Sequence, residues 1–233
     1  MVDKRNSKGR DRSRERAHED YVKAIYHLSG QAPVRAADLA RYLDVSRASV
    51  SKSRRALEDA GLVRASRGRV DALRLTPKGL ELAVSIVRRH RLVETFLHRE
   101  LKVPLERVHF DAEKMEHAIS DDIAQRLAAF LGNPRTDPHG HPIPAVHSTD
   151  VAALDIRLSE TSPGDHIVIT ALDDRDEASL KYLSAHGVLP GLRISVEDIS
   201  SQGVRLRSGR KRLTISKRAA NEVHCAPAGR GQA

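Results

Sequence analysis

The sequence has very little cysteine, few aromatic residues and no long hydrophobic segment. Cys225 is its single cysteine, which excludes an internal disulfide and a cysteine-based zinc knuckle and fits a reducing cytoplasm. Tryptophan is absent and aromatic residues make up 3% of the chain, which argues against binding by stacking on unpaired bases. No run of about 18 apolar residues occurs, and no apolar segment follows the basic N-terminus. We therefore expect neither a transmembrane helix nor a secretory signal.

Positive charge is present in excess, and it is concentrated in the first third of the chain. The formal net charge is +9. Residues 1–78 contain 19 Lys and Arg against 10 Asp and Glu, whereas residues 79–233 contain 21 of each kind. This asymmetry is typical of a DNA-binding domain joined to neutral domains. Double-stranded DNA is therefore the expected partner.

The N-terminal third has the pattern of a winged helix-turn-helix. Residues 1–16 are polar and Arg-rich, so we expect a disordered basic arm, followed by a helix over 17–29. Two short helices then flank a tight turn that ends at Ser46, the expected N-cap of the second helix. Two strands around Arg67-Gly68-Arg69 predict the wing.

Basic and hydroxyl side chains cluster on the second of these helices and on the wing. Base contacts are expected from Ser49 and Lys52, near the N-terminal half of the helix, and phosphate contacts from the arginines. The alternative is that this helix is only a polar surface. The predicted DNA-binding residues are Arg47, Ser49, Ser51, Lys52, Arg54, Arg55, Arg67 and Arg69.

Two longer helices and a small β domain are predicted for the rest of the chain. The helices cover 79–100 and about 111–131, and the turn-rich residues 135–144 mark a boundary. Short strands separated by Gly and Pro then predict a small β-barrel with one short helix. The helices carry apolar residues suited to a core and a two-fold interface: Leu80, Ala83, Ile86, Val87, Ile119, Ile123, Leu127 and Phe130.

Carboxylates and histidines recur on the predicted helices at helical spacing. Glu113, Glu116 and His117 would share one face of the second helix, and His90 and Glu94 would share a face of the first. His109, just before the second helix, and Asp20, in the N-terminal helix, would supply further donors. The alternative is a solvated acidic face with hydrogen-bonded histidines.

The ordered motifs Asp20-Tyr21, His90-x-x-x-Glu94 and Glu113-x-x-Glu116-His117 resemble the diphtheria toxin repressor family, in its manganese-transport-regulator branch. The Pro-His-Gly-His-Pro-Ile-Pro stretch resembles the segment that follows that family's dimerisation helices, and the C-terminal domain resembles the SH3-like (FeoA-like) domain of its longer members. The resemblance, which runs over residues 17–145, implies a primary and an ancillary metal site. Their implied ligands are Asp20, Glu113, Glu116 and His117 for the first, and His90, Glu94 and His109 for the second.

The fold class that follows is mainly α with small β. Its expected parts are a basic arm (1–16), a winged helix-turn-helix (17–79), a helical metal-binding and dimerisation domain (80–147), an SH3-like β-barrel (148–226) and a tail (227–233).

The donor atoms favour manganese(II) as the effector. Iron-type members of the family have Met at the position of Asp20 and Cys at that of Glu113, and hard carboxylate donors at both positions suit manganese(II), although iron(II) also fits. Lys23 replaces a glutamate of the short manganese members, so two separated sites are expected. The acidic run Asp173, Asp174, Asp176 and Glu177 is expected to be a solvated loop, with a ligand role as the alternative.

The expected function is a manganese(II)-dependent repressor that binds palindromic operators as a homodimer and controls metal uptake genes. An iron(II)-dependent repressor and a winged-helix regulator with a small organic effector are alternatives, as is a sequence-neutral architectural protein. A metallohydrolase is disfavoured because the sequence has no HExxH, glycine-rich phosphate loop or GxSxG. We therefore expect no enzymatic activity, no small organic substrate and no membrane partner.

Overall fold

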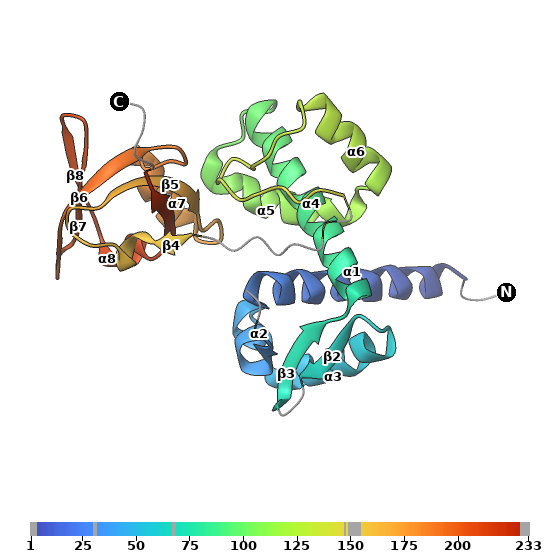
Figure 1. The fold of residues 1–233 in the computed structure, drawn as a ribbon. Coiled ribbons are helices and arrows are strands. Elements are labelled where there is room, and N and C mark those ends of the chain that lie inside the picture. The colour runs from blue at the N-terminus through green and yellow to red at the C-terminus, as the bar shows by residue number, and fades with distance from the viewer. Residues whose placement is uncertain (1–3, 30–31, 67–68, 147, 149–154, 229–233) are drawn as a thin grey trace. The chain divides into compact units, whose positions relative to one another are not determined.

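The computed structural model describes residues 4–29, 32–66, 69–146, 148 and 155–228 (Figure 1). These residues belong to two compact units. The first contains residues up to Arg89, together with Glu116–Ala124 and the described part of 144–152. The second contains His90–Met115, Gln125–Ile143 and the residues from 155 onward. None of the described helices is long and apolar enough to cross a membrane.

A winged helix-turn-helix forms most of the first unit, as the sequence predicts. Its three helices share one core, in which the fully buried side chains include Val22, Ile25, Leu39 and Leu57. Ser46 caps the second helix of the helix-turn-helix, the recognition helix, by accepting a hydrogen bond from the Ser49 N–H at 3.1 Å. A three-stranded sheet of order β1-β3-β2 carries the wing. The elements are α1 (Lys4–Ser29), β1 (Val34–Arg35), α2 (Ala36–Tyr42), α3 (Arg47–Asp59), β2 (Val63–Ser66) and β3 (Arg69–Leu75).

The prediction of a disordered arm over residues 1–16 is wrong for its described part, because α1 is helical from Lys4. Lys, Arg and Glu are strong helix formers, and no proline precedes residue 33. Once the amphipathic part of the helix is anchored at residues such as Tyr21 and Ile25, these neighbours extend it toward the N-terminus at little cost.

The helical region agrees with the prediction at its first helix and differs at its second. Helix α4 (Pro77–Arg99) matches the predicted range. The expected single helix over 111–131 is wrong, because the chain forms α5 (Leu105–Met115), a 3-10 turn (Glu116–Ala118) and α6 (Asp121–Phe130). Ser120 Oγ accepts a hydrogen bond from the Ile123 N–H at 3.3 Å and caps α6, which is the local reason for the new helix start.

The C-terminal domain is a six-stranded antiparallel sheet of order β4-β9-β5-β6-β7-β8. Within the described residues no pairing joins the end strands β4 and β8, so the expected closure into a barrel is not seen. The sequence pattern missed β4, which has two residues, and β9. The elements are β4 (Ile156–Arg157), β5 (His166–Leu172), α7 (Glu177–Ala185), β6 (Arg193–Ser200), β7 (Gly203–Ser208), β8 (Lys211–Ile215), α8 (Lys217–Ala220) and β9 (Val223–Pro227).

A tight loop at residues 135–143 lies against the sheet, within the second unit. The Asp137 N–H donates to the His141 carbonyl at 3.0 Å, which closes the loop. The Leu172 N–H, at the end of β5, donates to the His139 carbonyl at 2.9 Å. Gly140 has φ +93°, and a Cβ there would lie 2.1 Å from the Thr170 carbonyl oxygen. Only glycine therefore allows this loop to approach β5 so closely.

Candidate metal sites

Asp20, Glu116 and His117 form the first group of potential metal ligands, all within the first unit. Asp20 comes from α1, and the other two from the 3-10 turn that follows α5. One ligand atom of each lies within 4.8 Å of the others. His117 Nε2 is 3.0 Å from Asp20 Oδ1 and 3.5 Å from Glu116 Oε1. The structure thus brings together three of the four residues predicted for the primary site.

His117 is held so that its Nε2 faces the other two ligands. Its Nδ1 lies 2.6 Å from Glu19 Oε2, and because a carboxylate only accepts, Nδ1–H is the donor. Burial alone would lower the pKa of His117, but hydrogen bonds to Asp20 and Glu19 outweigh it and raise this pKa to about 9. Without metal the imidazole is therefore protonated at neutral pH, and a divalent ion would take the place of the Nε2 proton.

Lys23 supplies a second internal cation to the first group. Its Nζ lies 2.9 and 2.8 Å from the two carboxylate oxygens of Glu116, and both side chains are buried. The sequence showed Lys23 only as the replacement of a glutamate. The structure adds that the ammonium group of Lys23 pairs with the Glu116 carboxylate, which a metal ion at the first group would also bind.

Glu113, the fourth residue predicted for the primary site, lies in the second unit. Its side chain is 51% exposed, and its Oε1 is 3.7 Å from His109 Nε2. The predicted shared face with Glu116 and His117 is wrong, because α5 ends at Met115 and helical spacing no longer applies beyond it. A role of Glu113 as a metal ligand stays a prediction.

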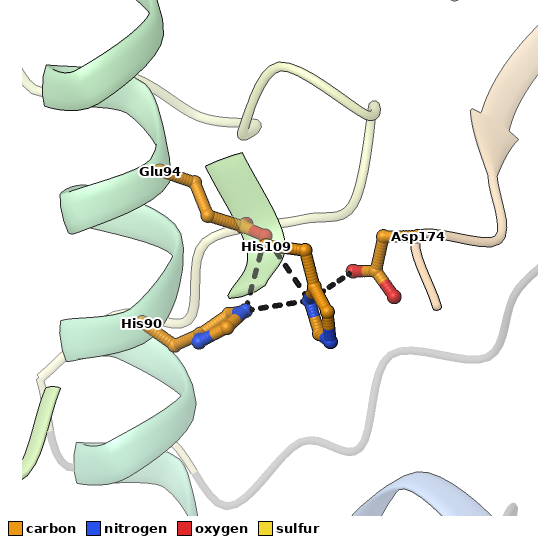
Figure 2. Close-up of side chains that lie close together, drawn as sticks. All are labelled: His90, Glu94, His109 and Asp174. Carbon is orange, nitrogen blue, oxygen red and sulfur yellow. Dashed lines mark hydrogen bonds and ion pairs between the residues drawn. The ribbon is translucent and has the colours of Figure 1, made fainter. Parts of the chain in front are cut away.

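The second group consists of His90, Glu94, His109 and Asp174 (Figure 2). Glu94 Oε1 lies 3.0 Å from His90 Nε2 and 3.4 Å from His109 Nδ1, and Asp174 Oδ2 lies 3.5 Å from the same Nδ1. The three residues predicted for the ancillary site are thus brought together. His109 lies in the middle of α5 and not before it.

The acidic run after β5 was predicted to be a solvated loop, and the structure differs from this prediction. Asp174 is 19% exposed and belongs to the second group. Asp173 pairs with His224 and Arg157, at 2.9 and 2.8 Å. Asp176 caps α7. The alternative in which this run supplies a ligand to the second group is therefore the better interpretation at Asp174.

The geometry of the second group fits a divalent ion. Metal–ligand bonds of about 2.0–2.2 Å place neighbouring ligands of an octahedral ion about 3 Å apart. His90 Nε2 and His109 Nδ1 are 3.1 Å apart, close to this separation. Both carboxylate oxygens of Glu94 are buried without a hydrogen bond, although two imidazoles are near. Imidazole and carboxylate donors without sulfur suit manganese(II), iron(II) and zinc(II).

The carboxylates of the second group also favour a positive charge beside them. Burial alone would lower the pKa of His109, but Asp174 and Glu94 raise it to about 10. Burial would raise the pKa of Glu94, yet His90 and His109 hold it well below its ordinary value. His109 likewise holds the pKa of Asp174 well below its ordinary value, against the opposing effect of burial. Without metal, the proton on His109 supplies positive charge.

A third group, Asp137, His139 and His141, was not predicted from the sequence, where residues 135–144 were interpreted as a turn-rich boundary and as a stretch that resembles the family, without a ligand role. All three side chains are buried. The available signal was three potential ligands within five residues, in a stretch that the turn residues Pro138 and Gly140 fold back on itself. The three groups together hold donors typical of divalent metal sites.

The predicted DNA-binding side chains are mostly exposed on α3. Arg54 is the exception, because it is partly buried and forms an ion pair with Glu58 at 2.9 Å. Arg67 lies outside the described residues, and Arg69 is in β3 with its side chain outside the described part. Those exposed on α3 are Arg47, Ser49, Ser51, Lys52 and Arg55.

Three family models match successive parts of the chain. Residues 15–69 match the N-terminal DNA-binding domain of iron dependent repressors. Residues 76–145 match the metal-binding and dimerisation domain of the same proteins. Residues 156–227 match the FeoA domain.

Individual relatives match almost the whole chain. The iron-dependent repressor IdeR of Mycobacterium tuberculosis is 33% identical over 220 residues, which is 88% of this chain and 94% of that protein. The diphtheria toxin repressor of Corynebacterium glutamicum is 30% identical over 197 residues, covering 79% and 84%. A solved manganese-dependent transcriptional repressor in complex with manganese matches 90% of this chain and 99% of its own, with a TM-score of 0.81 and 31% identity.

These matches confirm the resemblance seen in the sequence, and the proteins matched are transcriptional repressors and not enzymes. The chain belongs to the diphtheria toxin repressor and IdeR family of metal-dependent DNA-binding repressors, with a C-terminal FeoA domain.

Proposed function

We propose that a divalent ion bound at the first group activates this repressor, with iron(II) as the first candidate. The IdeR relative and the family model over residues 76–145 carry the name iron-dependent repressor, which supports iron(II) better than the manganese(II) inferred from the sequence. The structure contributes the Asp20–Glu116–His117 arrangement, whose oxygen and nitrogen donors accept iron(II).

Manganese(II) is the second candidate, on a specific observation. None of the three groups contains sulfur, so nothing in their donor atoms favours iron over manganese. The solved manganese-dependent repressor is 31% identical to this chain. A direct comparison of the two ions is therefore needed.

The proposed mechanism acts through α1. Asp20 lies on α1, which packs in one core with α2 and α3, whereas Glu116 and His117 lie on the 3-10 turn. An ion bonded to all three would tie α1 to that turn. By binding this arrangement more tightly than others, the ion would shift the population toward the form that binds DNA.

Homodimeric binding to palindromic operators is part of the proposal. One short recognition helix reads few bases, so specificity requires two such helices on inverted half-sites. The dimerisation-domain match supports this state, as do the large apolar side chains exposed on α6, Ile123 at 50% and Phe130 at 68%. Metal-uptake genes are the proposed targets.

The test is fluorescence anisotropy with DNA from the protein's own promoter region. The metal-stripped protein would be titrated with iron(II) under anaerobic conditions, manganese(II) or zinc(II), at matched free concentrations. We expect iron(II) or manganese(II) to increase the affinity for DNA, and equal affinity in EDTA and in metal would refute activation. Asp20→Ala should abolish the increase, whereas Asp198→Ala, on β6, should retain it.

A further inference from the structure

We propose that the second and third groups together hold two divalent ions that share the carboxylates of Glu94 and Asp174. The second unit would then take up two ions where the sequence predicts one ancillary site. Both groups lie within this unit, on α4, α5, the loop 135–143 and the residue pair after β5.

His139 presents a bare nitrogen to the second group. Its Nε2 lies 2.9 Å from the carbonyl oxygen of Leu105, and because a carbonyl only accepts, Nε2–H is the donor. In the neutral imidazole, Nδ1 then carries the lone pair. This Nδ1 is buried without a hydrogen-bond partner and lies 3.6 Å from Glu94 Oε1, which also has none. Two buried acceptors facing each other are costly unless a cation lies between them.

His141 and Asp137 repeat this pattern. His141 Nδ1 and Asp137 Oδ2 are 3.4 Å apart, buried, and each without a hydrogen bond. Arg91 Nε forms an ion pair with the same Asp137 oxygen at 3.6 Å, and a different nitrogen of this guanidinium, Nη1, donates a hydrogen bond to the Pro142 carbonyl. The other oxygen of Asp137 accepts from the N–H groups of His139 and His141, at 2.8 and 3.0 Å. The loop thus aims one oxygen and two imidazole nitrogens at one place.

Two carboxylates connect the groups. Glu94 Oε1 is near both imidazoles of its own group and also near His139 Nδ1. Asp174 Oδ2 lies 3.5 Å from His109 Nδ1 and 3.5 Å from His141 Nδ1. Carboxylates placed between two sets of ligands are the usual bridges of two-metal sites.

The number of donors and their charge also fit two ions. The groups contain seven ligand side chains, more than the roughly six positions of one octahedral ion. Glu113 beside His109 and the carboxylates of Glu94, Asp137 and Asp174 carry four negative charges, and Arg91 carries one positive charge, so two divalent ions would leave this region close to neutral.

His224 shows what an ordinary buried histidine looks like in the same unit. Its Nδ1 lies 3.2 Å from the Asp155 carbonyl oxygen, and its Nε2 lies 2.9 Å from Asp173 Oδ1. Both nitrogens therefore have protein partners. The inward nitrogens of His139 and His141 have no hydrogen bond and lie 3.4–3.6 Å from carboxylate oxygens, which separates a ligand position from a structural one.

The experiment counts manganese(II) ions in the full chain. In an Asp20→Ala/His117→Ala background, which removes the first group, equilibrium dialysis with elemental analysis should give two ions per chain. The electron paramagnetic resonance spectrum should show two spin-coupled ions. Adding Asp137→Asn and His141→Asn should leave one ion and no coupling, because two ligands of the third group are lost. The loop should keep its fold, since the asparagine oxygen at position 137 can still accept the hydrogen bonds of the two loop N–H groups. Adding His224→Asn, the matched control, should leave both ions.

One ion in the background protein, or two without spin coupling, would overturn the proposal whether or not the asparagine variant folds. Two ions retained by a folded asparagine variant would also overturn it. The count does not depend on DNA, so a failure of metal-dependent repression would leave this result interpretable.

Discussion

The carboxylate of Glu116 is close to two cationic side chains in the metal-free protein. Lys23 contacts both of its oxygens, and the imidazole of His117 lies 3.5 Å away. A metal ion at the first group therefore binds in competition with charges that the protein already has. This competition would weaken metal binding and raise the metal concentration at which the repressor responds.

Replacing the lysine tests this competition. Lys23→Met should tighten metal binding at the first group, since the ion no longer competes with the ammonium. The same change should destabilise the metal-free protein by roughly 3 kcal/mol, because a buried carboxylate loses a cation. Calorimetric metal titration and denaturation in EDTA measure the two effects. Lys23→Arg is the control that keeps the charge, and unchanged affinity in Lys23→Met would contradict the prediction.

The pKa of His117 predicts how the stability of the metal-free protein depends on pH. This pKa is raised from 6.5 to about 9 in the folded chain. The stabilisation by the imidazolium is therefore fully present below pH 6.5 and is lost as the pH rises through about 9. We expect the free energy of unfolding in EDTA to fall over this interval. Glu19→Gln, which weakens the hydrogen bond to Nδ1, should flatten the fall, and a flat wild-type profile would argue against the assignment.

Metal binding should show the opposite trend. Because the ion replaces the imidazole proton, its apparent affinity should rise over the same pH interval. Titration calorimetry at neutral pH in buffers of different ionisation enthalpy would count the protons released.

At the scale of elements, the loop 135–143 depends on one glycine. A side chain at Gly140 would collide with the Thr170 carbonyl on β5. Gly140→Ala should therefore displace the loop and weaken ion binding in the second unit, with the first group unaffected. Gly132→Ala is the matched control, since Gly132 has φ +77° with nothing within 4 Å of the added Cβ. Metal counts of the two variants make the comparison, and equal counts would contradict the role given to Gly140.

Local patterns predicted those elements whose signals are contained in a short window. The Ser46 cap predicted α3, the apolar spacing predicted α4, and the short segment bounded by Gly and Pro predicted β5, each correctly. The break between α5 and α6 was missed because apolar periodicity continues across it. The Ser120-Asp121-Asp122 cap was its local sign.

The ligand groups were predicted where the donors lie on one helix and missed where they depend on tertiary contacts. His90 and Glu94 are a helical pair, so the sequence found them. Asp174 reaches this pair from the sheet domain, and His139 through a loop held by β5. No pattern within a short stretch of sequence indicates that Asp174 or His139 lies close to this pair. Glu113 was assigned to the first group from its spacing on an assumed unbroken helix and from the family resemblance.

At the scale of the whole molecule, the excess of basic residues before residue 79 predicts which variants change the salt dependence of DNA binding. Each phosphate contact that is lost should reduce the slope of log affinity against log salt by about 1. Arg55→Ala, on the exposed face of α3, should show this reduction. Arg210→Ala, an exposed arginine of the sheet domain, should not. Equal slopes for the two variants would argue against α3 as the DNA-binding surface.

The hydrogen bond from the Leu172 N–H to the His139 carbonyl ties β5 to the loop that carries the third group, whereas the first group includes Asp20, whose side chain is 45% exposed. Release of an ion from the third group would require this loop to move away from β5. After sudden chelation we therefore expect two phases of metal release, a fast one from the first group and a slow one that Gly140→Ala accelerates. Such a repressor would lose its activating ion soon after the metal concentration falls, while the ions in the second unit would remain bound for longer.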